Sequence, residues 1–237
     1  MRDCQSAIRN LQSMKILHVL DHSLPYFSGY SFRSQYILRA QQQLGLDVFA
    51  VTSPKHEQFA NTIETLDGVE YHRTNWPTFS KVQMLPMARQ VATIATLAKE
   101  IKRLAVEFNV NLIHAHSPSL CGLAATRAAK ALTLPMVYEV RYYEEDAAVD
   151  RGKTRHNSLR YRLGQRAELE TLQQASAVTT ISRALRDDLV QRGVAAKKIV
   201  VVPNGVDLER FYPVERDPEL VRQHELQDQF VIGFIGS

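Results

Sequence analysis

Two histidines stand two residues apart at the end of the short apolar run NLIHAH, directly before a Ser-Pro pair. Residues two apart on a strand share a face, so the His114 and His116 rings can point to the same side. Such a pair suits a metal site, a packed pair at the strand end or the floor of an active site. A zinc site needs a third ligand, and neither Cys121 nor the acids at 144–146 lie at a recognisable ligand spacing. We therefore expect no metal here.

A second polar group follows the next predicted strand, in YEVRYYEED. Glu139 and Arg141 stand at its end, and a guanidinium can clamp a phosphate or carboxylate through two hydrogen bonds. Acids follow at once, Glu144, Glu145 and Asp146. No apolar strand runs into a D-x-D pattern that could bind a metal, so this stretch indicates a solvated acidic turn.

The loop SGYS leads into a helix, and the amides of a helix start can bind a phosphate. Gly29 and Tyr30 are therefore candidate substrate-binding residues, although Gly29 also fits a simple turn. Ser182 is expected first of all to cap a helix. Asn204 belongs to a turn, PNGVD, and both residues follow predicted strands on the substrate side.

The segment DRGKTRHNSLRYRLGQR, residues 150–166, is strongly basic. One interpretation is the solvated face of a helix, which is the usual place for such runs. The other is an interfacial patch attracted to anionic lipid. The sequence leaves both open.

Apolar runs and helical patterns alternate along the chain. Strands are predicted at 15–20, 47–53, 69–74, 111–116, 135–140, 177–181 and 198–203. Helices are predicted at about 32–44, from Pro86 through an apolar stripe to residue 106, and at 119–132, 157–174 and 182–193. Continuously apolar strands that alternate with helices predict a Rossmann-like, doubly wound parallel sheet of the α/β class. The loops after 20, 116, 140, 181 and 202 should then face one site.

Composition narrows the class of protein. The chain has 237 residues, 45% of them hydrophobic and 23% charged, with a formal charge of +4 and a pI near 9.1. This basic excess suits anionic ligands but is too weak to imply nucleic acid. Neither a bilayer-spanning apolar run nor a signal peptide is visible, and Cys4 and Cys121 form no motif. We expect a reduced, cytoplasmic protein.

Four parts are expected along the chain. Residues 1–13 read as a disordered extension, 14–215 as the Rossmann-like domain and 216–229 as a charged linker. The fresh apolar run FVIGFIGS at 230–237 predicts the first strand of a second α/β domain. We expect the chain to be truncated at the start of that domain.

The series KILHVL, SGYS, IHAHSP, TTISRALRDDL, VVPNGVDLERFYP and VIGFIGS resembles the N-terminal half of a group 1, or family 4, retaining glycosyltransferase of the GT-B fold. The resemblance covers nearly all of residues 14–237. It implies transfer of a sugar from a nucleotide-diphosphate donor to a hydroxyl acceptor, without a further cofactor. His116 would line the cleft and contact the reacting sugar, whereas His114 would be structural. Tyr30 stands where the family usually has a second glycine, so close backbone approach there is more restricted.

The resemblance also implies partners and a location. The acceptor would be a glycan or a lipid-linked molecule of cell-surface or exported polysaccharide synthesis, handled on the inner face of the plasma membrane. The 19-residue run LDHSLPYFSGYSFRSQYIL and YEVRYYEEDAAVDRG further resemble transferases of bacterial exosortase and exopolysaccharide systems. The residues that grip the donor would lie in the second domain, so this chain alone should be inactive.

Three alternatives remain. A nucleotide-sugar epimerase of the same fold would share these features, and an inactive fragment or binding module is also open. A dinucleotide-binding protein is disfavoured, because the loop DHSLPYFSGYS after the first strand lacks G-x-G-x-x-G.

Overall fold

The computed structural model describes residues 14–57, 59–76 and 86–234. The chain forms two units, which divide between Pro203 and Asn204. Sequence analysis placed the domain boundary later, at residue 215. Each unit is described by itself.

A single sheet of eight strands forms the centre of the first unit. Its strands are β1 (Lys15–Leu20), β2 (Asp47–Thr52), β3 (Ile63–Leu66), β4 (Val69–Arg73), β5 (Leu112–His116), β6 (Met136–Val140), β7 (Ala177–Thr180) and β8 (Ile199–Val201). Their order is β3-β4-β2-β1-β5-β6-β7-β8, and neighbours run parallel except for the β3–β4 pair. The predicted α/β, Rossmann-like parallel sheet is confirmed.

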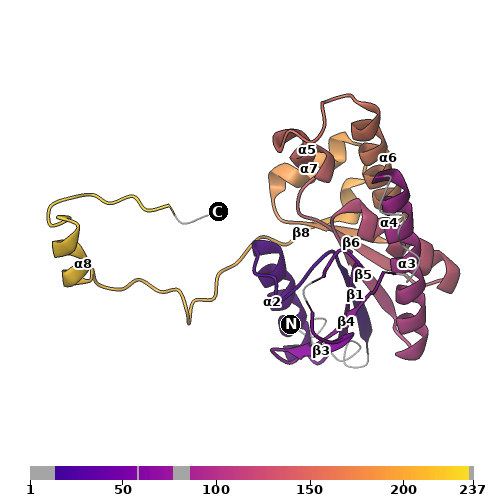
Figure 1. Ribbon diagram of the computed structural model, residues 1–237, viewed down its shortest axis with the longest axis horizontal. Helices are drawn as coiled ribbons and strands as arrows, with labels where there is room; N and C mark the ends of the chain where they lie inside the picture. The colour runs from indigo at the N-terminus through magenta and orange to yellow at the C-terminus, as the bar shows by residue number, and fades with distance from the viewer. Residues whose placement is uncertain (1–13, 58, 77–85, 235–237) are drawn as a thin grey trace. The chain divides into compact units, whose positions relative to one another are not determined.

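Helices cover both faces of this sheet. They are α2 (Gly29–Gln43), α3 (Pro86–Glu107), α4 (Ser119–Leu132), α5 (Glu144–Asp150), α6 (Leu159–Gln174) and α7 (Arg183–Gln191), with a 3₁₀ turn at Ala196–Lys198. Figure 1 shows α2 on one side of the strands and α3, α4 and α6 on the other. The predicted helices are all present, with ends that differ from the prediction by a few residues.

Each face has its own apolar core. Leu17, Val19 and Ile113 belong to one cluster together with buried residues of α3, α4 and α6, while Ile16 and Leu20 belong to a second cluster together with Leu38 of α2. Alternate residues of β1 thus serve opposite faces, as the two-residue period of a strand requires. The strand is buried on both sides, which explains why it is apolar almost throughout.

The winding direction reverses between β1 and β5. From β1 the chain proceeds outward through β2 to β4, and from β5 it proceeds the other way to β8. In open α/β sheets, ligands bind beyond the carboxyl ends of the strands at such a reversal. The ends of β1 and β5 are therefore where a functional site is expected.

The edge strand β3 was not predicted. Its residues alternate between exposed and half-buried, and it pairs with β4 through the turn Asp67–Gly68. Both turn residues have positive φ, 50° and 78°. An Asp-Gly pair in this conformation is a typical two-residue hairpin turn, so the sequence did contain a signal for this strand.

The predicted acidic turn at 144–146 is wrong. These residues form the first turn of helix α5, where carboxylates are favoured by the positive end of the helix dipole. Glu145 is buried and pairs with Arg192 at 3.2 Å, and Asp146 accepts a hydrogen bond from the Tyr161 hydroxyl at 2.7 Å. The acids join α5 to α6 and α7 and are not a solvated turn.

The second unit contains one short helix among its described residues, α8 (Pro218–Gln223), which Asp217 caps within the predicted linker. Residues 230–234 pair with no strand in the described part of the chain. The strand and the second domain proposed there stay predictions. Among the described residues, no helix is both long and apolar enough to cross a bilayer.

Candidate functional site

Strand register gathers the predicted polar residues on one face of the sheet. His18 in β1 lies opposite His114 in β5, and His116 lies opposite Glu139 in β6. Arg141 follows Glu139 by two residues and so shares its face. The result is a buried polar cluster at the point where the winding reverses. We call it the histidine–arginine network.

A directed chain of hydrogen bonds runs through this network. Arg141 Nη2 lies 2.7 Å from His116 Nδ1, His116 Nε2 lies 2.9 Å from His18 Nδ1, and His18 Nε2 lies 2.7 Å from Gln41 Oε1. A guanidinium can only donate, so His116 Nδ1 must accept. His116 then donates through Nε2 to His18, which donates through Nε2 to Gln41. One tautomer of each histidine satisfies the whole chain.

Glu139 balances the positive charges of the network. Its Oε1 accepts from Arg33 Nε at 2.8 Å and from Arg141 Nε at 2.9 Å. Burial alone would raise the pKa of this carboxyl, but the contacts with His116 and Arg141 hold that pKa well below its usual range. With two guanidinium cations, one carboxylate and neutral histidines, the network retains one positive charge.

The histidines are neutral because they are buried beside a cation. Burial, and next the Arg141 charge, lower the pKa of His116 to about 3. Burial and the neighbouring imidazoles also hold the pKa values of His18 and His114 well below the ordinary value. This agrees with the tautomers that the hydrogen bonds require.

Arg141 holds helix α2 to the strand ends. Its Nη1 donates to the Tyr30 carbonyl at 3.0 Å and to Ser34 Oγ at 3.1 Å. Its guanidinium carbon lies 4.4 Å from the centre of the Tyr30 ring, in cation–π geometry. The Arg141 guanidinium thus donates hydrogen bonds to Glu139, to His116 and to two residues of α2.

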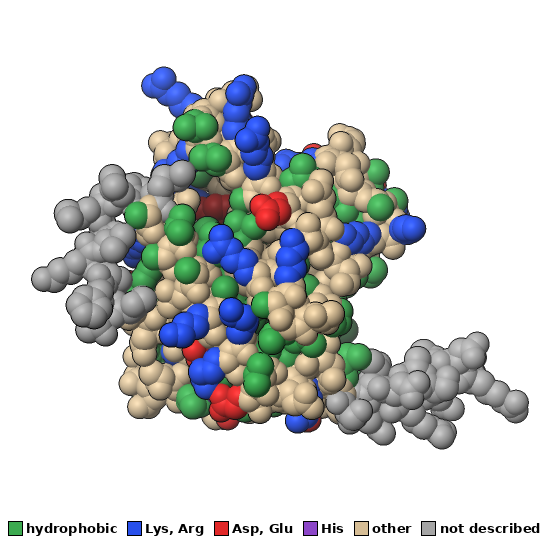
Figure 2. Space-filling view, turned by 90° about the vertical axis from the view of Figure 1, so that its right-hand side faces the viewer, with side chains coloured by type: hydrophobic (Ala, Val, Ile, Leu, Met, Phe, Trp, Pro, Cys, Tyr) green, Lys and Arg blue, Asp and Glu red, His purple; other side chains and the backbone are tan. Residues whose placement is uncertain are grey.

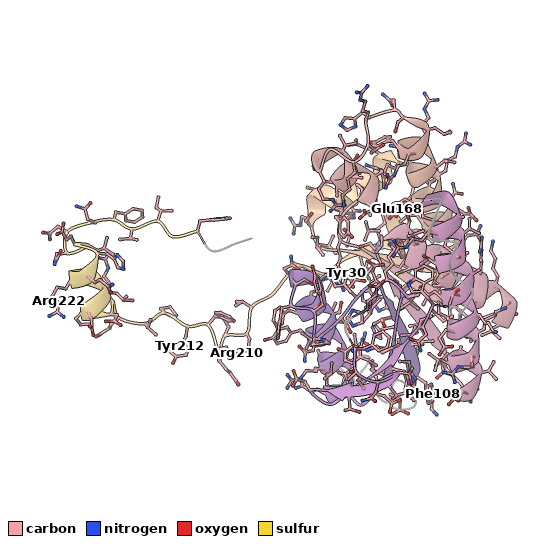
Figure 3. All side chains as sticks on the ribbon, in the orientation of Figure 1. Tyr30, Phe108, Glu168, Arg210, Tyr212 and Arg222 are labelled. Atoms are coloured by element: carbon pink, nitrogen blue, oxygen red, sulfur yellow. The ribbon has the colours of Figure 1, made fainter. Side chains whose placement is uncertain are left out.

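The other predicted site residues lie around or outside the network. Gly29 and Tyr30 form the first turn of α2, and the Tyr30 hydroxyl accepts from the Asp21 amide at 3.1 Å. Figure 3 shows Tyr30 where α2 approaches the strand ends. Ser182 caps α7 by accepting from the Leu185 amide at 3.1 Å, as predicted. Asn204 is the first residue of the second unit.

Sequence analysis missed three members of the network, His18, Arg33 and Gln41. Arg33 also donates to the carbonyls of Val202 and Pro203, at 2.8 and 3.2 Å. His18 did carry a signal, because it interrupts the apolar run KILHVL. Arg33 and Gln41 are polar residues of an amphipathic helix and carried none.

The three histidines together offer three nitrogen atoms, which is enough to hold a metal ion. A nitrogen from each of His18, His114 and His116 lies within 4.8 Å of the others. A metal-bound histidine usually donates its outer N–H to a carboxylate or carbonyl. The outer nitrogen of His116 instead faces the Arg141 guanidinium, which cannot accept and would repel a cation. The donor set therefore suits the hydrogen-bond chain better than a metal ion.

Comparison with known proteins agrees with this architecture. Residues 28–205, more than half of the chain, match the family described as "Glycosyl transferase 4-like domain". The chain belongs to this glycosyltransferase family. It is 26% identical over 225 residues to a GDP-mannose-dependent alpha-mannosyltransferase of Mycobacterium tuberculosis, a match that covers 94% of this chain and 56% of that protein.

Solved structures support the fold. The sucrose-phosphate synthase of Thermosynechococcus elongatus superposes with a TM-score of 0.64 at 16% identity, over 90% of this chain and 53% of that one. The Anabaena protein HepE in complex with UDP gives a TM-score of 0.56 at 19% identity, over 90% and 50%. This glycosyltransferase 4-like chain spans about half the length of the relatives it matches.

Proposed function

We propose that this chain forms the acceptor side of a retaining glycosyltransferase that moves a hexosyl group from a nucleotide-diphosphate sugar to a hydroxyl. The family match over residues 28–205 carries the proposal. The similarity to a mannosyltransferase adds support for a hexosyl donor. In this reaction the bond from the anomeric carbon to the diphosphate breaks, a bond to the acceptor oxygen forms, and the proton of the acceptor hydroxyl passes to the leaving diphosphate.

The charge of the histidine–arginine network suits this chemistry. Arg33 and Arg141 outweigh Glu139, and the neutral histidines leave the net charge positive. Fixed positive charge at the strand ends favours a phosphate-bearing ligand and stabilises negative charge on a leaving diphosphate. Gly29 and Tyr30, at the start of α2, lie on the same edge of the sheet and would contact the substrate.

His116 is the residue we propose to contact the reacting sugar. It is fully buried, and both its ring nitrogens are hydrogen-bonded, to Arg141 and to His18. A sugar hydroxyl can therefore bind this imidazole only by replacing one of these partners. Displacement of Arg141 would free both a neutral acceptor nitrogen and a guanidinium that could then bind phosphate. Glu139 would hold that guanidinium in place.

The setting proposed for the reaction is cell-surface or exported glycan synthesis on the cytoplasmic side of the membrane. The acceptor would be a glycan or a lipid-linked molecule. These finer assignments, and the association with exosortase systems, rest on the resemblance of sequence motifs alone.

A nucleotide-sugar epimerase is the second candidate, because UDP-GlcNAc 2-epimerase of Methanocaldococcus jannaschii superposes with a TM-score of 0.51 over 80% of this chain. At 13% identity the likeness concerns the fold, whereas the family match concerns transferases. Transfer is therefore the preferred function.

The test uses the longest reading frame that contains residues 1–237, incubated with a panel of UDP- and GDP-sugars and a mixture of glycan and lipid acceptors. We expect release of the nucleoside diphosphate and a product whose anomeric proton coupling matches that of the donor. His116→Ala should slow this release about 100-fold, the lower range for loss of a catalytic side chain. His156→Ala, an exposed histidine, should leave the rate unchanged.

Two results would reject the proposal. Release of no diphosphate from any donor would exclude transfer, and a nucleotide sugar that changes its stereochemistry while the diphosphate stays attached would identify an epimerase. Equal rates for His116→Ala and the unmodified protein would remove His116 from the reaction.

A further inference from the structure

The chain between Arg151 and Ala167 contains no acidic residue. Its cations are Arg151, Lys153, Arg155, Arg160, Arg162 and Arg166. Within the described residues, Arg151 pairs with Glu144 at 2.9 Å, and the other five form no ion pair with a carboxylate. A dense, uncompensated positive charge therefore lies in the loop before α6 and on its first turns.

Helix α6 adds apolar side chains to this charge. Leu159, Arg162, Leu163 and Arg166 are spaced by three and four residues, so they share one helix face. Leu159 is 74% exposed and Leu163 is 36% exposed. The opposite face holds Tyr161 and Glu168, which are buried. Neither leucine belongs to the buried core clusters, and both lie beside arginines on the same helix face; these four residues are called the leucine–arginine face.

This face lies at the same edge of the sheet as the histidine–arginine network. The last residue of α6 leads directly into the start of β7, so its first turn lies toward the carboxyl ends of the strands. Figure 2 shows Lys and Arg side chains gathered with hydrophobic ones at the top of the molecule, where Figure 1 places α5 and the start of α6.

We propose that the leucine–arginine face binds an anionic membrane surface. Arginines flanking exposed leucines match the two parts of a lipid interface, because the cations meet headgroup phosphates while the leucines enter the acyl boundary. A purely electrostatic partner such as nucleic acid would give the leucines nothing to contact. Docking through this face would turn the strand ends toward the lipid. It does not depend on the sugar transfer proposed above.

Vesicle sedimentation with the full chain tests this docking. We expect binding to vesicles of phosphatidylcholine with phosphatidylglycerol in physiological salt, and no binding to vesicles of phosphatidylcholine alone. Each basic residue near an anionic surface strengthens the partition about fivefold. Arg162→Gln with Arg166→Gln should therefore weaken binding to the anionic vesicles about 30-fold.

A matched control removes the same charge elsewhere. Lys99 and Lys102 are exposed on the second half of α3, toward the amino ends of the strands. Lys99→Gln with Lys102→Gln should keep most of the binding. Leu159→Ser with Leu163→Ser keeps all the charge and should still weaken binding at least tenfold, because it removes only the apolar contact.

Three outcomes would overturn the proposal. These are equal binding to both kinds of vesicle, equal loss in the arginine and lysine variants, and full binding by the leucine variant. A fourth is tight binding to heparin, used as a soluble polyanion, without binding to anionic vesicles. That result would identify a polyanionic macromolecule as the partner. Circular dichroism of each variant confirms that the helices are retained, so loss of binding is not loss of fold.

Discussion

Glu139 and Glu168 are buried to the same extent, each 2% exposed, yet their pKa values are shifted in opposite directions. Glu139 sits in the histidine–arginine network with two guanidinium partners, and its pKa lies well below the usual range. Glu168 lies on α6, where its Oε2 accepts one bond from the Tyr138 hydroxyl at 3.0 Å. Burial raises the pKa of Glu168 to about 8.

The comparison shows that burial alone does not set the charge of a carboxyl group. Transfer to a poorly solvated interior raises the pKa of both, and only a paired cation reverses the direction. Glu168 Oε1 has no hydrogen-bond partner among the described residues. The charge of Arg192 lowers the pKa of Glu168, but it is the smallest of the named causes of the shift. Figure 3 labels Glu168 on α6, in a different part of the unit from Tyr30. One buried acid is anionic and the other is neutral near pH 7.

The largest effect should come from removing a cation of the charged cluster. Within the part of the chain that the structure describes, Arg141→Met leaves Glu139 with the Arg33 guanidinium as its remaining arginine partner and removes the donor to His116. We expect the free energy of unfolding to fall by about 3–5 kcal/mol, the usual cost of breaking a buried ion pair. Urea unfolding at pH 7 measures this loss.

The matched control is Arg162→Met, which removes an exposed arginine and should change stability by less than about 0.5 kcal/mol. If both variants unfolded at the same urea concentration, the network would not stabilise the fold. The pairing of Glu139 with arginine would then contribute nothing measurable to the free energy of unfolding.

A smaller effect is expected at Glu168, where the free energy of unfolding should depend on pH. Its pKa is about 8 in the folded chain against 4.5 as the reference value. Because the folded state then holds a proton that the unfolded state has released, stability is highest below pH 4.5 and declines as pH rises toward 8. The slope is about 1.4 kcal/mol per pH unit while the two states differ by one proton.

Glu168→Gln keeps the bond from Tyr138 but cannot ionise. Relative to the unmodified chain, this variant should gain about 3 kcal/mol between pH 5 and pH 8. Thermal unfolding across that range measures the gain, and Glu170→Gln, exposed on the same helix, serves as the control. Parallel pH curves for all three proteins would show that Glu168 is ionised in the fold.

The smallest effect concerns the end of the hydrogen-bond chain. Gln41→Leu removes the acceptor of His18 Nε2 and leaves a buried N–H without its partner, at a cost of about 1–2 kcal/mol. Nitrogen-15 spectra of the imidazoles should show a mixture of tautomers for His18 in this variant and a single one in the unmodified chain. Gln43→Leu, an exposed neighbour, should leave the spectra unchanged. A mixture already present in the unmodified chain would contradict the directed chain.

Much of the fold could be predicted because buried parallel strands consist mainly of apolar residues. Short runs such as those of β1 and β5 can be recognised as strands from the sequence, and the helices between strands show a regular apolar stripe. Strand β3 escaped because four alternating residues at an edge resemble a loop. Helix α5 escaped because its sequence, EEDAAVD, gives no apolar stripe, and a salt bridge from Arg192 stabilises it instead.

The site could be predicted only where its residues end a strand. Glu139, Arg141 and His116 were found in this way. The role of His18 depends on β1 lying next to β5, which strand order decides and local sequence does not. Glu168 was hidden for a similar reason, since only the packing of α6 shows that this helix turns one carboxyl group inward.

The bonds of Arg33 have a mechanical consequence. This side chain holds the carbonyls of Val202 and Pro203, the last residues of the first unit, and at the same time the carboxylate of Glu139. Tension applied to the chain beyond residue 204 would therefore be passed to the centre of the sheet by the Arg33 guanidinium, as well as to β7 by the bond from the Val202 amide to the Thr180 carbonyl. Pulling on the exit of the chain would act on the same Glu139 carboxylate that accepts from Arg141.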